Sequence, residues 1–70
     1  MKIIKTLVKK TSFGYTNVIE FYKEGDKCCY RNIEEWEDGH ITFGRDNFAG
    51  DKDYANNKYK RLLAEGYTVR

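Results

Sequence analysis

The sequence predicts a small α+β domain, with a four-stranded antiparallel sheet and one main C-terminal helix packed on one face. The first two-thirds of the chain alternate apolar and polar residues in runs separated by glycine-containing turns, a pattern typical of strands joined in hairpins. The last third spaces its apolar residues at helical intervals and ends at Gly66. With 70 residues, we expect one domain over residues 1–70, built around one small core.

Composition limits the classes of function. Charged residues make up 34% of the chain and aromatic residues 16%, which indicates a folded chain, and the formal net charge is +2. That net charge is too small to indicate nucleic-acid binding by itself. Lys5 and Thr6 interrupt the apolar run of MKIIKTLVKK, so we expect neither a signal peptide nor a membrane span.

The first three strands follow from alternation and from turn residues. Residues 2–9 and 15–23 predict the first two strands, and the turn at 24–26 leads directly into the third. If Glu24 and Gly25 form a two-residue loop, Phe21 would pair with Cys28.

A second hairpin is predicted at Asp38-Gly39, a strong signal for a two-residue turn. This turn would pair Trp36 with Ile41, and Glu34 with Phe43. Because a glutamate is not expected on the buried side of a sheet, we expect a bulge around Glu34 that turns it outward.

Residues 45–50 are expected to cross over to a helix from about Asp51 to Glu65, followed by a short extended tail. The apolar helix residues share one face: Ala55, Tyr59, Leu62 and Leu63. A helix of about four turns covers only one side of such a sheet. The residues expected beneath it are Ile19, Phe21, Tyr30, Trp36 and Ile41.

The other side of the sheet, here called the open face, is expected to display a tyrosine among charged residues. Its predicted members are Val18, Glu20, Tyr22, Lys27, Cys29 and Arg31. An aromatic residue among charges is typical of a protein interface. An ordinary solvated sheet face explains the same composition equally well.

No constellation for catalysis or metal binding emerges. His40 has Glu37 as its expected cross-strand neighbour, so a surface ion pair explains it better than a general base. The acidic residues around Trp36 lack the spacing of metal ligands, and Cys28 and Cys29 have no second cysteine pair to complete a set. We therefore expect no enzyme activity, no catalytic or metal-binding residue and no cofactor. Two free thiols are typical of a reducing cytosol.

Basic residues form two groups, on the first strand and on the helix, interleaved there with Tyr54 and Tyr59. They are Lys2, Lys5, Lys9, Lys10, Lys52, Lys58, Lys60 and Arg61. These groups could follow a phosphate backbone, so a small nucleic-acid-binding module is the alternative function. A solvated helix face is the simpler interpretation, because acids nearly balance the bases and no groove-reading motif is present.

Several residues, taken in order, resemble a small phage-encoded anti-CRISPR family whose relative inhibits the type I-F surveillance complex. They are the opening MK-x-IK-x-L, Tyr15-x-Asn17, Tyr22, Gly25-x-Lys27, Arg31, Gly39 and Arg45-Asp46. The resemblance covers roughly the first two-thirds of the chain with short gaps. It implies a four-stranded antiparallel sheet backed by helix. It also implies a non-enzymatic inhibitor that docks on the repeated backbone subunits of the crRNA-guided complex and prevents target DNA from pairing with the guide.

The resemblance also implies contact residues. Tyr22 corresponds to a contact tyrosine on the family's second strand, and Glu34 to a contact glutamate after the third strand if a gap is placed there. Thr6 stands where the family has a further tyrosine, and the region after Phe48 is shorter than the family's two-helix C-terminal part.

We therefore expect a phage-type inhibitor of a host CRISPR effector protein, acting in the host cytoplasm without a membrane. Its predicted partner-binding residues are Glu20, Tyr22, Lys27 and Arg31, extended by Glu34. A homodimer through the open face is compatible with this function and with the nucleic-acid alternative.

Overall fold

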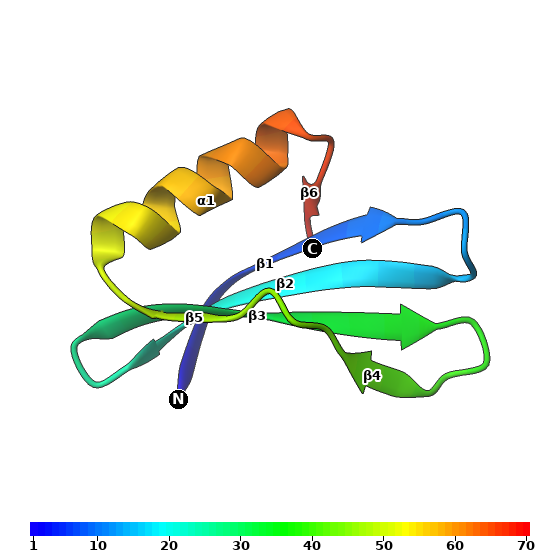
Figure 1. Ribbon diagram of the computed structural model, residues 1–70, viewed down its shortest axis with the longest axis horizontal. Helices are drawn as coiled ribbons and strands as arrows, with labels where there is room; N and C mark the ends of the chain where they lie inside the picture. Colours follow the sequence, from blue (N-terminus) through cyan, green and yellow to red (C-terminus); the bar gives the residue numbers. More distant parts are fainter.

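The computed structural model describes all 70 residues as one antiparallel sheet and one helix (Figure 1). The elements are β1 (Lys2–Lys10), β2 (Tyr15–Glu24), β3 (Lys27–Trp36), β4 (Ile41–Phe43), β5 (Phe48–Gly50), α1 (Lys52–Ala64) and β6 (Thr68–Val69). The strand order is β4-β3-β2-β1-β6, and β5 pairs with β3 beside β4. The predicted α+β class is therefore confirmed, but the sheet has six strands rather than four, because residues 48–50 and 68–69 also pair.

Helix α1 lies across one side of the sheet and closes the core there (Figure 1). Its N-cap is Asp51, whose side chain accepts a hydrogen bond of 2.7 Å from the Asp53 backbone N–H. Gly66 ends the helical segment with φ +100°, a conformation that favours glycine. The buried core residues are Leu7, Ile19, Phe21, Tyr30, Ala55 and Leu62.

The first hairpin has a different loop from the one predicted. Its two loop residues are Gly25 and Asp26, so Phe21 pairs with Tyr30 and the predicted pairing with Cys28 was wrong. The register moved by two residues. Because side chains alternate with a period of two, this shift leaves the side chains of β2 and β3 on the faces that the alternation predicted. Glu34 is the exception, because it was expected to turn outward at a bulge.

The second hairpin has three loop residues, Glu37 to Gly39, where two were predicted. The Trp36 N–H donates to the His40 carbonyl at 3.0 Å, and Gly39 has φ +96°. Ile41 therefore pairs with Glu35 and not with Trp36. A register change of one residue turns a strand over, so the side chains of β4 lie on the opposite side of the sheet from the predicted one.

Three further predictions for the second hairpin were wrong, and so was one for the helix. Ile41 lies on the open face and is 56% exposed, not beneath α1. Trp36 lies outside the helix-covered core and contacts Tyr15, with ring centroids 4.8 Å apart. No bulge forms around Glu34, because β3 pairs with β2 without a register shift. Leu63, predicted on the packed face of α1, is 40% exposed because the core contact is made by Leu62.

Candidate protein-binding surface

The open face is organised in cross-strand rows that alternate in polarity. One apolar row joins Ile3, Tyr22, Cys29 and Ala49, and a second joins Val8, Val18, Ile33 and Phe43. The polar row between them joins Thr6, Glu20 and Arg31, and a mixed row of Lys10, Thr16, Glu35 and Ile41 follows the second apolar row. Cross-strand neighbours are close enough to contact one another, so each row acts as one strip of surface.

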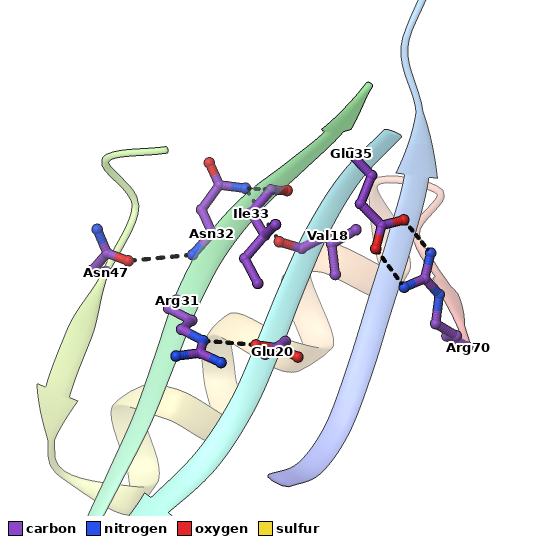
Figure 2. Close-up of polar contacts among 8 residues, drawn as sticks. All are labelled: Val18, Glu20, Arg31, Asn32, Ile33, Glu35, Asn47 and Arg70. Atoms are coloured by element: carbon purple, nitrogen blue, oxygen red, sulfur yellow. Dashed lines mark hydrogen bonds and ion pairs between the residues drawn. The ribbon is translucent and has the colours of Figure 1, made fainter. Parts of the chain in front are cut away.

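Four of the five predicted binding residues lie on this face. Arg31 Nε is 2.6 Å from Glu20 Oε1, and Figure 2 shows this ion pair joining β3 to β2. The Arg31 guanidinium also lies 5.6 Å from the centroid of the half-buried Tyr22 ring. Arg31 therefore contacts both Tyr22, the predicted anchor, and Glu20. Lys27 lies exposed at the beginning of β3.

Glu34, the fifth predicted residue, lies on the other side of the sheet. It pairs across from Thr42, whose hydroxyl donates to Glu34 Oε1 at 2.7 Å, and that hydroxyl also accepts from Trp36 Nε1 at 2.9 Å. The carboxylate on the open face is its neighbour Glu35. The structure thus separates Glu34 from the other four predicted residues.

Glu35 forms a clasp with the C-terminal residue, Arg70. The two guanidinium N–H groups of Arg70 donate to the two Glu35 carboxylate oxygens at 2.6 and 2.9 Å (Figure 2). The Arg70 backbone N–H donates to the Thr6 carbonyl at 2.9 Å. The guanidinium hydrogen bonds lower the pKa of Glu35, and the carboxylate raises the pKa of Arg70. Because β2 and β1 lie between β3 and β6, the clasp crosses part of the open face.

Sequence reasoning missed the most exposed apolar part of this face. Ile41 is 56% exposed and Phe43 73% exposed, and both neighbour the half-buried Ile33. We call these three residues the β4 corner. The available signal was Gly39 as the third residue of a Glu-Asp-Gly loop, a pattern that also fits a three-residue hairpin with a positive-φ glycine.

The groups considered for catalysis do not converge on a site. His40 stacks on Trp36 with centroids 5.4 Å apart and contacts Asp38 rather than the predicted Glu37. Hydrogen bonds from the backbone and side chain of His40 lower the pKa of Asp38. No three His, Cys, Asp or Glu side chains lie close enough together to hold a metal ion.

Two of the basic residues considered for nucleic-acid binding are engaged within the molecule. Lys58 Nζ lies 2.7 Å from Asp46 Oδ2, and its side chain is 16% exposed. Lys9 Nζ donates to the carbonyl of Glu65 at 2.6 Å. These contacts leave two fewer free cations for a phosphate backbone than the sequence suggested.

Comparison of the chain with protein-family models, curated proteins and solved structures finds no significant match. The one helix of the fold is too short and too polar to cross a membrane.

Proposed function

We propose that this chain is a non-enzymatic, phage-type inhibitor that binds a host CRISPR effector protein and blocks binding of its target nucleic acid. The observation that carries the binding role is the row pattern of the open face, with Tyr22 at one end and the exposed β4 corner at the other. The choice of target follows the sequence resemblance.

The layout of the face supports protein binding on physical grounds. Interfaces combine apolar and aromatic anchors with a polar surround that sets register and association rate. Here the ion pair of Glu20 and Arg31 lies between the two apolar rows, and both partners are partly exposed, at 20% and 34% of their side chains. A partner that covers both rows would bury this pair, so it would have to offer polar groups opposite it.

The test is Tyr22→Ala, with binding to purified CRISPR effector components measured by biolayer interferometry. Truncating a desolvated tyrosine anchor typically costs about 2 kcal/mol or more, so the dissociation constant should rise roughly 30-fold. Tyr54→Ala is the matched control, because Tyr54 is 51% exposed on α1, on the other side of the sheet. Unchanged affinity of a folded Tyr22→Ala protein would remove the open face as the docking surface.

A homodimer would use the same face and must be separated from inhibitor binding. Solution mass measured by light scattering decides this, because a dimer through the β4 corner should dissociate in a Phe43→Ala variant. A monomer in the wild-type protein leaves the whole face free for a different partner.

A further inference from the structure

A groove lies beneath the N-terminal half of α1, and its lining includes Tyr22 and Cys29 of the open-face rows as well as residues of the helix side. Its volume is about 450 Å³, and β1, β2, β3 and α1 all contribute to its walls. The apolar lining includes Ile4, Phe21, Cys28, Ala55 and Tyr59. Both the volume and the apolar lining are those of small-molecule sites, which usually measure roughly 300–1,000 Å³.

Three lysines surround this apolar lining. They are Lys5, Lys23 and Lys52, and no aspartate or glutamate lines the groove with them. Register places Lys5 across from Phe21 and Lys23 across from Cys28, so both belong to the helix side of the sheet.

None of the three lysines takes part in an ion pair within the molecule. Lys52 is the first residue of α1, where the helix dipole adds to the positive potential. The groove therefore combines an apolar interior with three lysines that form no ion pair.

We propose that this groove binds a single-chain anionic amphiphile, for which a medium-chain fatty acid is the simplest form. The apolar lining accepts the alkyl chain, and the lysines attract the carboxylate. A polypeptide strand fits less well, because the register of β1 against β2 breaks between Ile3 and Lys5, on the strand that would have to accept it. This site goes beyond the proposed inhibitor role and does not depend on it.

The first experiment titrates the full-length chain with dansyl-labelled undecanoate, whose fluorescence rises in an apolar site. We expect saturable binding that dodecanoate reverses and dodecyltrimethylammonium, with the same chain length and opposite charge, does not. The double variant Lys5→Glu/Lys52→Glu should weaken binding about tenfold. Lys10→Glu/Lys60→Glu is the matched control, with the same charge change on exposed residues of the same two elements outside the groove, and it should change binding less than twofold.

Cys28 supplies a second readout that does not depend on the probe. Both cysteines line the groove, but Cys28 is half-buried whereas Cys29 is only 2% exposed, so Cys28 is the thiol that a maleimide should reach first. Dodecanoate should slow maleimide addition at Cys28 severalfold, as mapped by mass spectrometry.

Each of four outcomes would overturn the proposal. They are no saturable probe response, equal displacement by the cationic amphiphile, equal loss of binding in the two double variants, and displacement only by a peptide of alternating Glu and Leu. The last outcome would assign the groove to a polypeptide partner.

Discussion

On the helix side of the sheet, Leu7, Ile19 and Leu62 are at most 3% exposed, whereas on the open face Ile41 and Phe43 are 56% and 73% exposed. The same strands build both sides, and the difference comes from what covers them. Helix α1 covers one side, and the Glu35–Arg70 clasp crosses part of the other. The open face therefore retains apolar surface that its own chain does not bury.

The open face nevertheless contains fully buried positions. Val18 is 1% exposed and Cys29 is 2% exposed, although neither belongs to the core cluster closed by α1. Their cross-strand neighbours shield them, so short-range packing within the rows stabilises this side. The two sides thus differ mainly at the sheet edge, where β4 presents exposed apolar side chains.

The sharpest test of this comparison is Leu62→Ala, on the helix side. Removing a buried leucine side chain costs about 2–5 kcal/mol of unfolding free energy, close to the total of roughly 3–5 kcal/mol expected for a domain of this size. Far-UV circular dichroism with urea should show a largely unfolded variant. Leu63→Ala is the control, because Leu63 is next in sequence but 40% exposed, and it should shift the urea midpoint only slightly. Equal shifts in both variants would contradict the assignment of the core.

Phe43→Ala should have the opposite profile, affecting binding but not folding. Phe43 is 73% exposed, so the unfolding free energy should change by less than about 0.5 kcal/mol. Affinity for the effector protein should fall by about 2 kcal/mol if the β4 corner is an anchor. Phe13→Ala offers a matched control, because Phe13 is 77% exposed in the loop between β1 and β2. A thermal midpoint lowered by about ten degrees in Phe43→Ala would correspond to more than about 1 kcal/mol of unfolding free energy and would show that this corner is structural.

Gly44→Ala tests the close packing of Gly44 against Asn32, a buried polar residue on the helix side of the sheet. Asn32 is 7% exposed there, and its amide donates to the Val18 carbonyl at 3.3 Å. A Cβ on Gly44 would overlap the Asn32 side chain, so we expect a loss of roughly 1–2 kcal/mol of unfolding free energy. In an Asn32→Ala background the same substitution should cost almost nothing. A cost that persists there would mean that Gly44 is required for another reason.

Much of this arrangement could be predicted, because side chains along a strand alternate with a period of two, so a register error of two residues leaves each side chain on the same face. In the first hairpin the predicted pairing register was wrong by two residues, yet Tyr22, Glu20 and Arg31 still share the open face. The second hairpin was misplaced by one residue, and that moved Ile41 to the other side of the sheet. The parity of a loop length decides the face, and Asp38-Gly39 alone does not reveal it.

The remaining features could not be predicted, because they depend on strands too short to show alternation or on contacts between residues far apart in the sequence. Strands β5 and β6 have three and two residues, so they contain no measurable alternation. The clasp joins Glu35 to Arg70, 35 residues apart, and only the pairing of β6 with β1 brings them together. Trp36 was expected beneath the helix with the other residues of that sheet face, but it packs on Tyr15 and His40 at the hairpin end.

The smallest predicted effect concerns the Glu35–Arg70 clasp. It tests whether the part of the open face that the clasp crosses is covered in solution. Arg70 lowers the pKa of Glu35 below its ordinary value of 4.5, so the carboxylate stabilises the fold at neutral pH. This contribution to the unfolding free energy is lost as the pH falls from the ordinary pKa of a glutamate through the lowered pKa of Glu35. The carboxylate and guanidinium side chains are 37% and 49% exposed, so the effect should stay below about 1 kcal/mol.

Thermal unfolding midpoints at pH 7 and pH 3 should therefore differ less in Glu35→Gln than in the wild-type protein. Glu37→Gln serves as the control, since Glu37 is exposed in the hairpin loop and forms no ion pair. If Glu35→Gln keeps the full pH dependence, the clasp does not form in solution, and the rows beneath it belong to the accessible surface. In that case Val8 and Thr6, which lie in those rows, would be accessible to a partner. Effector affinity should then be unchanged in Arg70→Ala. If the clasp does form, removing Arg70 should instead alter affinity, because a partner spreading from the β4 corner would meet it.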